Sequence, residues 1–116
     1  MNIQDLVGKT FGTVCQSSRG RADTLEFISK TDTYYFMHKQ DCCEDVHIND
    51  TIGDLNDLEG EPILSAEVVT ETSSNDNMHQ TWTFYKFATI KGYVTVRWIG
   101  ESNGYYSEEV ELFKEE

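Results

Sequence analysis

Side chains that bind metals or act as nucleophiles are concentrated in one short stretch of the chain. In order along the chain, the stretch holds His38, Asp41, Cys42, Cys43, Glu44 and His47. Thiolates, imidazoles and carboxylates are all zinc ligands. However, adjacent cysteines on a strand point to opposite faces, so both could ligate one ion only from within a turn. In the alternative interpretation, one cysteine packs in the core and the acidic groups are solvated.

We favour this alternative, and we therefore predict neither a bound metal nor a cofactor. The turn remains a candidate binding site, formed by Asp41, Cys42, Cys43 and Glu44. A catalytic cysteine is not expected, because nearby carboxylates raise the pKa of a thiol and so suppress its reactive form. A calcium loop is not expected either, because one starting at Asp50 or Asp54 would need an oxygen ligand at Ile52 or Leu58.

A second candidate site lies near the C-terminus, in the stretch Ser102-Asn103-Gly104-Tyr105-Tyr106-Ser107. Hydroxyls, two phenols and a glycine-containing turn meet there, and we expect Arg97 and Lys86 to lie nearby on the sheet. A small anion or a protein loop could bind to such a set, and aromatic groups on loops often anchor interfaces. The alternative is a tight turn beside an ion ladder. The candidate binding residues here are Arg97, Ser102, Asn103, Gly104 and Tyr105, with Tyr105 pointing outward and Tyr106 inward.

Charge is distributed unevenly along the chain, whose net charge is −12. Between Gln40 and Tyr85 there is no Lys or Arg, but there are eleven carboxylates: Asp41, Glu44, Asp45, Asp50, Asp54, Asp57, Glu59, Glu61, Glu67, Glu71 and Asp76. Direct binding to nucleic acid is not expected, because phosphate contacts require a basic face. The acidic stretch would suit a basic protein partner or would imitate nucleic acid, and the simpler alternative is a solvated, solubilising surface.

Length and cysteine content indicate one intracellular domain. The 116 residues fit a single core, and 12% of them are aromatic, too many for a disordered chain. No apolar run is long enough to cross a membrane, and the N-terminus does not resemble a secretory signal. The cysteine count is odd, and a disulfide between the adjacent Cys42 and Cys43 would be strained. We therefore expect reduced cysteines and a location in the cytoplasm of a host cell.

Runs rich in β-branched and aromatic residues predict a mainly β fold. We expect strands at 10–16, 24–29, 33–38, 44–48 and 63–72, with a loop at 17–21, a hairpin loop at 30–32 and a polar loop at 73–77. Between Thr51 and Gly60 the spacing of apolar residues indicates a short helix capped by Asp50 or Thr51. Another short helix is expected at residues 2–7.

The last third of the sequence predicts a hairpin whose turn is Lys91-Gly92, with Ile90 opposite Tyr93. One face of this hairpin would belong to the core, through Tyr85, Phe87, Val94, Val96 and Trp98. A three-residue loop, Ser102-Asn103-Gly104 with a left-handed Gly104, would then lead to a third strand of a meander. It would place Val110 beside Val96, Leu112 beside Val94 and Glu109 beside Arg97. The whole chain is predicted to form seven or eight antiparallel strands that tend to a small barrel or sandwich.

Two blocks of the sequence carry a family resemblance. One block runs from Asp41-Cys42-Cys43-Glu44-Asp45-Val46 to Pro62-Ile63, and the other from Thr81-Trp82-Thr83-Phe84-Tyr85 to Ser102-Asn103-Gly104-Tyr105-Tyr106-Ser107. Together they resemble a small domain of unknown function that occurs in bacteriophages and bacteria. The resemblance covers about residues 5–113. It implies a phage or prophage origin and an intracellular setting, and it implies no activity.

The leading functional hypothesis is a non-enzymatic, phage-type protein that binds a host or phage protein through an acidic or aromatic surface. The partner would have a basic surface, and neither nucleic acid nor membrane is expected to bind directly. The alternative is a small-ligand or metal-binding domain that uses the Cys42-Cys43 turn or the region of Arg97 and Ser102–Ser107. An enzyme with an unfamiliar site is a third hypothesis. A free sheet edge would also let two copies pair as a homodimer.

Overall fold

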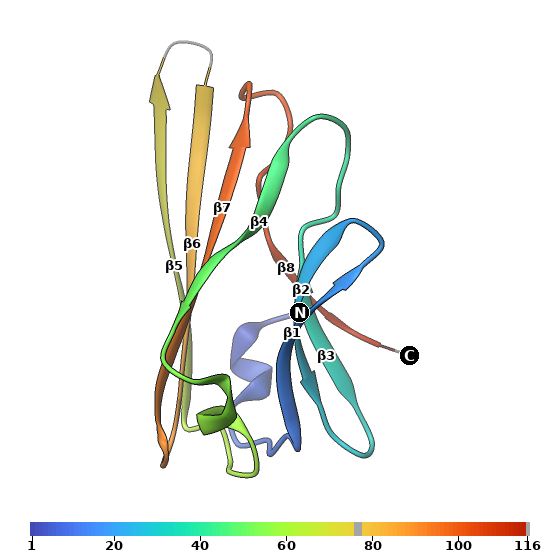
Figure 1. Cartoon of the computed structure of the whole chain (residues 1–116), viewed down its shortest axis with the longest axis vertical. Coiled ribbons are helices and arrows are strands. Elements are labelled where there is room, and N and C mark those ends of the chain that lie inside the picture. The colour runs from blue at the N-terminus through green and yellow to red at the C-terminus, as the bar shows by residue number, and fades with distance from the viewer. Residues whose placement is uncertain (76–77, 116) are drawn as a thin grey trace.

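The computed structural model describes residues 1–75 and 78–115 (Figure 1). Within these residues the elements are η1 (Ile3–Leu6), β1 (Thr13–Arg19), β2 (Ala22–Ile28), β3 (Thr33–Met37), β4 (Asp45–Ile52), η2 (Leu55–Leu58), β5 (Ser65–Asn75), β6 (Met78–Thr89), β7 (Gly92–Ser102) and β8 (Glu111–Lys114). They form two antiparallel sheets, ordered β1-β2-β3-β8 and β4-β7-β6-β5. The predicted mainly β fold with about eight antiparallel strands is therefore confirmed, with two open sheets in place of a closed barrel.

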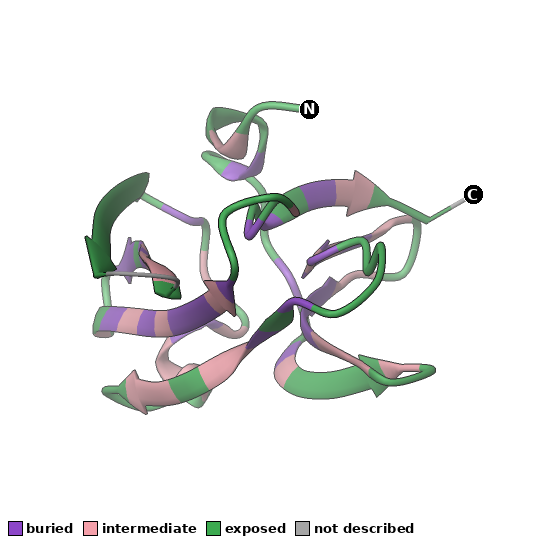
Figure 2. Cartoon of the chain, turned by 90° about the horizontal axis from the view of Figure 1, so that it is seen from above, coloured by how far each residue is buried: buried purple, intermediate pink, exposed green. Residues whose placement is uncertain are grey.

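The core lies between the two sheets, where Figure 2 shows the buried residues gathered. Phe27 of β2 belongs to this core. The centroid of its ring lies 5.0 Å from that of Phe87 of β6 and 6.0 Å from that of Phe36 of β3. Aromatic pairs at such distances stabilise a fold by about 0.5–1.5 kcal/mol beyond simple burial. Phe27 and Phe87 come from different sheets, so this contact holds the two sheets together.

The first two hairpins are formed partly as predicted. Ile28 pairs with Thr33, so the hairpin between β2 and β3 is confirmed. The strand predicted at 10–16 instead runs from Thr13 to Arg19, and the predicted loop at 17–21 is only a turn after Arg19. The turn is this tight because Gly20 adopts a φ of 64°, which a residue without a Cβ reaches at little cost.

The hairpin between β6 and β7 has the predicted core face, and all five predicted core residues are buried. Its turn is displaced by one residue, because Thr89 pairs with Gly92 and leaves Ile90 and Lys91 in the loop. The hydroxyl of Thr89 accepts a hydrogen bond from the amide of Lys91 and supports this turn. Each residue of β6 therefore meets a partner two positions from the predicted one, which keeps the same side chains on the core face.

The predicted C-terminal meander is wrong. The free side of β7 pairs with β4, and β8 pairs with β3 in the other sheet, where Tyr35 lies opposite Phe113. Asp50 of β4, and not Glu109, lies opposite Arg97 and binds its guanidinium through two hydrogen bonds. Val110 and Leu112 are buried as expected, but the chain that carries them crosses from one sheet to the other.

Strands β4 and β5 are longer than the sequence predicts. β4 extends to Ile52, and β5 continues through the expected polar loop to Asn75, which pairs with Met78. Residues 76 and 77 of that predicted loop lie outside the described residues. The hairpin of β5 and β6 therefore lies along the 45 Å long axis of the molecule (Figure 1).

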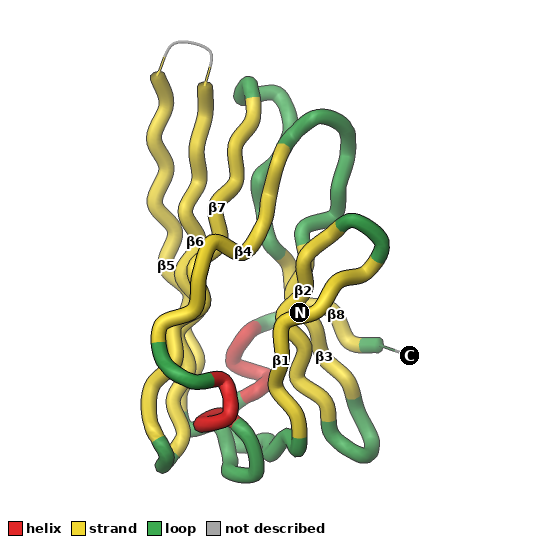
Figure 3. Tube along the Cα trace, in the orientation of Figure 1, coloured by secondary structure: helices red, strands yellow, loops and turns green. Residues whose placement is uncertain are grey.

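Both predicted helical segments contain a single turn of 3-10 helix (Figure 3). η2 occupies four residues of the segment predicted between Thr51 and Gly60. Its N-cap is Asp54, whose carboxylate accepts from the amide of Asn56, whereas the predicted caps Asp50 and Thr51 belong to β4. None of the helices among the described residues has the length and apolar composition that a membrane span needs.

Candidate functional site

The turn that contains the adjacent cysteines is built around the carboxylate of Glu44. Glu44 is buried, and its oxygens accept from the amides of Asp41 and Cys42, at 2.9 and 2.8 Å, and from Nε2 of His38 at 2.8 Å. Burial raises the pKa of Glu44, but these hydrogen bonds outweigh it and lower the pKa to about 2. The Glu44 carboxylate is therefore occupied within the protein, although it belongs to the predicted binding set.

The cysteines of this turn are joined to each other. A disulfide links Cys42 to Cys43, whereas the sequence predicts that both are reduced. The local chain turns at this point, which brings the two sulfur atoms to the same side, whereas on an extended strand they would point apart. Cys15 is the one free cysteine of the chain. In the described part of the chain, no group of three or more His, Cys, Asp or Glu side chains is arranged to hold a metal ion.

Arg97 does not lie beside the Ser102–Ser107 stretch. It is five positions before Ser102 on β7, so the two side chains point to opposite faces of the sheet and are separated by about 16 Å along the strand. Its hydrogen bonds to Asp50 lower the pKa of that carboxyl group. The predicted association of Arg97 with the turn is wrong, because the pairing of β4 with β7 supplies Arg97 with an acidic partner elsewhere.

The Ser102–Ser107 stretch forms a turn with its own side-chain hydrogen bonds. Ser102 is buried and accepts from the amide of Gly104 at 3.0 Å, while Asn103 accepts from the amide of Tyr105 at 3.0 Å. Gly104 has a φ of 91°, the predicted left-handed conformation. Tyr105 is 82% exposed, as predicted, and Tyr106 is half-buried against it.

The two predicted candidate sites lie next to each other in the structure. Asp45 pairs with Glu101, which brings the cysteine turn beside the end of β7. Together they line a hollow of about 370 Å³, formed by Cys43, Glu44, Asp45, Met78, Glu101, Ser102, Asn103 and Tyr106. Segments about sixty residues apart in the sequence therefore contribute to one concave surface. Asp41, Cys42, Gly104 and Tyr105 belong to the same two turns but do not line the hollow.

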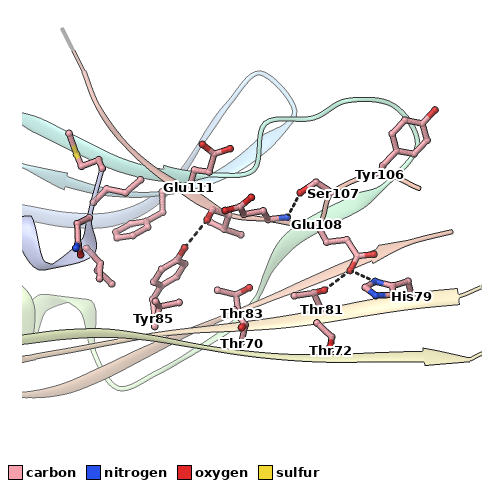
Figure 4. Close-up of a pocket in the computed structure, with 18 of the residues that line it drawn as sticks. Thr70, Thr72, His79, Thr81, Thr83, Tyr85, Tyr106, Ser107, Glu108 and Glu111 are labelled. Carbon is pink, nitrogen blue, oxygen red and sulfur yellow. Dashed lines mark hydrogen bonds and ion pairs between the residues drawn. The ribbon is translucent and has the colours of Figure 1, made fainter. Parts of the chain in front are cut away.

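A larger cleft of about 790 Å³ adjoins this hollow and shares Tyr106 with it. One wall is the inner face of β5 and β6, which carries Thr70, Thr72, Thr81 and Thr83, and the opposite wall is the segment from Gly104 to Leu112 (Figure 4). The hydroxyls of Thr70, Thr72 and Thr83 make no hydrogen bond to another described residue. Hydroxyls both donate and accept, so this wall can bind either kind of polar group.

Glu108 holds the two walls of the cleft together. Its buried carboxylate accepts from the hydroxyl of Thr81 at 2.6 Å and from Nδ1 of His79 at 3.0 Å (Figure 4). It also accepts from the hydroxyl of Ser102. Burial raises the pKa of Glu108, but the hydrogen bonds from Ser102, Thr81 and His79 together keep it below its usual value. An ionised carboxylate is thus buried at the boundary between the cleft and the hollow.

Sequence reasoning missed Glu108, His79 and the threonine wall. The alternation of threonine with aromatic residues from Thr81 to Tyr85 was a usable signal, because it places the hydroxyls on one face of a strand. Glu108 had no such signal, since its burial depends on Gly100. A Cβ on Gly100 would lie 2.7 Å from the Cβ of Glu108, so only glycine leaves room for this side chain.

The pair of His79 and Glu108 resembles the orienting half of a catalytic triad, because a carboxylate binds one ring nitrogen and leaves the other free. A nucleophile is the missing part. Among the described residues, no serine or cysteine is hydrogen-bonded to His79, and the hydroxyls of Ser102 and Thr81 donate to Glu108 itself. The arrangement therefore serves to fix an imidazole at the cleft wall, where it can bind a polar ligand.

The acidic stretch identified from the sequence does not form one uniform face. Several of its carboxylates are used inside the fold, since Glu44 accepts from backbone amides, Asp50 binds Arg97, Asp54 caps η2 and Glu59 accepts from the amide of Val14. The exposed remainder includes Asp41 and Asp45 at the cysteine turn and Glu67 and Glu71 on β5. The excess negative charge that a partner would meet therefore lies at the cysteine turn, on β5 and on the glutamates of the cleft.

Replacing Glu44 with Gln is expected to destabilise the protein at pH 7 by about 2–4 kcal/mol, since hydrogen bonds to the carboxylate are weakened. The folded pKa of Glu44 is depressed, so its contribution is present above the unfolded pKa and is lost as the pH falls toward 2. Urea unfolding between pH 7 and pH 2.5 measures this, and the gap between wild type and E44Q should narrow as the pH falls. The exposed Glu71→Gln is the control, and an equal loss in E71Q would contradict the assignment.

Replacing Gly100 with Ala is expected to destabilise the protein by about 1–3 kcal/mol, because the new Cβ forces the Glu108 segment outward. The matched control is Gly12→Ala, since a Cβ at that position would have no heavy atom within 4 Å. Its unfolding free energy should stay within about 0.5 kcal/mol of wild type. Equal stability of both variants in urea would show that Glu108 does not depend on the space above Gly100.

Comparison with known proteins is consistent with this description of a site without an assigned activity. A family model described as a domain of unknown function, DUF7448, matches residues 4–112. Neither a curated protein nor a solved structure matches the chain. The match spans nearly the same residues as the resemblance noted in the sequence. The chain therefore belongs to the DUF7448 family of domains of unknown function.

Proposed function

We propose that this domain is a non-enzymatic binding protein whose acidic cleft receives a positively charged segment of another protein. The observation that carries the proposal is the composition of the cleft. Its lining includes Glu108, Glu109 and Glu111, and none of the described residues that line it is Lys or Arg. An anionic ligand such as a phosphate would meet three carboxylates and no Lys or Arg side chain among the described lining residues, whereas an ammonium or guanidinium group would be attracted.

The remaining features of the cleft suit a polypeptide. One part of its lining is apolar, with Ile3, Phe36 and Val68, and another part carries the threonine hydroxyls and His79. A polypeptide offers apolar side chains, charged side chains and backbone groups within a few residues of one another. The volume of about 790 Å³ is within the range of typical ligand clefts.

The setting proposed for this interaction follows from the sequence. A phage or prophage origin is supported by the resemblance of the two sequence blocks, and the partner would be a host or phage protein with a basic surface. The cytoplasm of the host cell is the proposed location, supported by the same resemblance, which implies an intracellular setting. The net charge of −12 makes direct nucleic-acid binding unfavourable.

The proposal predicts that the protein binds a peptide of about nine residues in which Lys and Val alternate at the odd positions and Thr occupies the even positions. The same peptide with Glu in place of each Lys should not bind. The double variant E109K/E111K should weaken binding by at least about tenfold, because it places two cations in the cleft. Fluorescence anisotropy at two salt concentrations measures the affinity.

The matched control for this experiment is D41K/E61K, which changes the net charge equally but lies outside the cleft. Its affinity for the Lys peptide should stay within about threefold of wild type. If both double variants lose binding equally, net charge and not the cleft attracts the peptide, and the proposed site is wrong. Loss in D41K/E61K alone would move the site to the acidic stretch from Asp41 to Glu61.

A second candidate function is small-ligand binding in the hollow between the cysteine turn and the end of β7. The convergence of Cys43, Ser102 and Asn103 on one concave surface of about 370 Å³ favours it. Native mass spectrometry of the purified protein, compared with its denatured mass, tests this candidate. A retained small molecule that is lost on Ser102→Ala would support it, and a bare protein mass would leave the acidic cleft as the functional site.

A further inference from the structure

β5 is an edge strand along most of its length. It pairs with β6 on one side, and within residues 1–75 and 78–115 no strand pairs with its other side. Only the beginning of this edge is covered, where the side-chain amide of Gln4 donates a hydrogen bond to the carbonyl of Ala66. Figure 2 shows β5 exposed along nearly its whole length.

The contact with Gln4 reveals which backbone groups point outward. In an antiparallel ladder, alternate residues direct both N–H and C=O to the same side. The carbonyl of Ala66 points away from β6, and the pairing of β5 with β6 has no register shift from Ser65 to Asn75. The amides and carbonyls of the residues in step with Ala66, namely Val68, Thr70 and Thr72, therefore point to the open edge.

Against strand pairing, this edge has the charges of Glu67 and Glu71, which repel an acidic strand and attract a basic one. Other natural edge strands carry Lys, Pro or a bulge, or are covered by another element. Over Glu67 to Asn75, β5 contains neither Lys nor Pro, and its pairing is regular. A regular, uncovered edge of this length is the template that extended peptides use when they add to a sheet.

The side chains on the two faces of β5 form the surfaces that such a peptide would contact. On the inner face, Val68, Thr70 and Thr72 line the acidic cleft. On the outer face, Val69 is 38% exposed and lies between Glu67 and Glu71, which form no ion pair with a described residue. An added strand would therefore direct one row of its side chains into the cleft, and the other row would lie beside Glu67, Val69 and Glu71.

We propose that the partner binds as an additional strand on the edge of β5, through an extended segment with a basic, an apolar and a basic residue at alternate positions. The inference rests on the proposed function, since it specifies how the basic segment is held. The two basic residues lie beside Glu67 and Glu71, and the apolar residue lies beside Val69. Cross-strand pairs of opposite charge each stabilise a sheet by up to about 1 kcal/mol.

A second copy of this chain fits the edge less well than a basic partner. Antiparallel pairing of two β5 strands about Val69 would place Glu67 of each copy beside Glu71 of the other. Like charges directly opposite each other destabilise a sheet. Each copy also has a net charge of −12, which adds repulsion at longer range.

The test uses the same Lys peptide with two variants at one position. Thr70→Pro removes an edge amide without removing a hydrogen bond to β6, whereas Thr70→Ala removes only the hydroxyl. T70P is expected to bind the peptide at least about tenfold more weakly than T70A does, because both variants lack the hydroxyl and only T70P lacks the edge amide. In wild type, hydrogen exchange at the amides of Thr70 and Thr72 should slow when the peptide is added, a readout that does not depend on the folding of T70P. The charge-reversed E67K/E71K should prefer the Glu peptide.

The outcomes separate this inference from the proposed function. Strand addition would be overturned if T70P and wild type bound the peptide equally and the amides of Thr70 and Thr72 gained no protection from hydrogen exchange. In that case, a loss of binding in E109K/E111K would still support the cleft as the binding site. Failure of wild type to bind the Lys peptide at all would reject both. Sedimentation that shows a dimer of wild type, and a monomer of T70P, would overturn the basic partner in favour of a second copy.

Discussion

The course of the C-terminal chain depends on the burial of one charge, that of Glu108. A carboxylate leaves water at a high cost unless donors replace its hydration, and three donors do so here. The donors belong to β6 and β7, whereas Glu108 belongs to the segment that leaves β7 for the other sheet. The network therefore attaches this crossing segment to the sheet that it leaves, and β8 can pair with β3 while the cleft stays between the two walls.

The carboxylates of the acidic stretch perform two kinds of task. Glu44, Asp54 and Glu59 accept hydrogen bonds from backbone amides at turns and at the start of β1. Tight connections between strands leave such amides without a backbone partner, so side chains must supply the acceptors. Glu67 and Glu71 form no ion pair with another described residue and lie on an exposed strand. A high net charge thus results partly from local folding needs, and exposed carboxylates such as these two remain to attract another molecule.

β5 connects the cleft and the sheet edge because one set of residues serves both. In a strand, side chains stand perpendicular to the sheet while amides and carbonyls lie in its plane. Thr70 and Thr72 therefore present hydroxyls to the cleft and backbone groups to the open edge. The N-terminal turn covers only the first residues of that edge through Gln4, which leaves the length beside the cleft accessible.

Composition and alternation along the chain were enough to predict which residues face the core and where most strands lie. The alternation in Tyr85, Phe87, Val94, Val96 and Trp98 placed one sheet face correctly even though the turn was displaced, because a shift of two residues preserves the face. The strands at 24–29 and 33–38 also followed from composition. The sequence indicated individual residues of the two predicted sites, but it did not show that the two turns lie next to each other.

The neighbours of each strand could be identified only in the folded protein. Local periodicity is the same for a strand that continues a meander and for one that crosses to the other sheet, so the destination of β8 was not contained in it. The partner of Arg97 was decided by the pairing of β4 with β7, and the junction of the cysteine turn with the Ser102–Ser107 turn by the same pairing. The burial of Glu108 required donors from two strands at once and space above Gly100, and such coincidences exist only after the chain has folded.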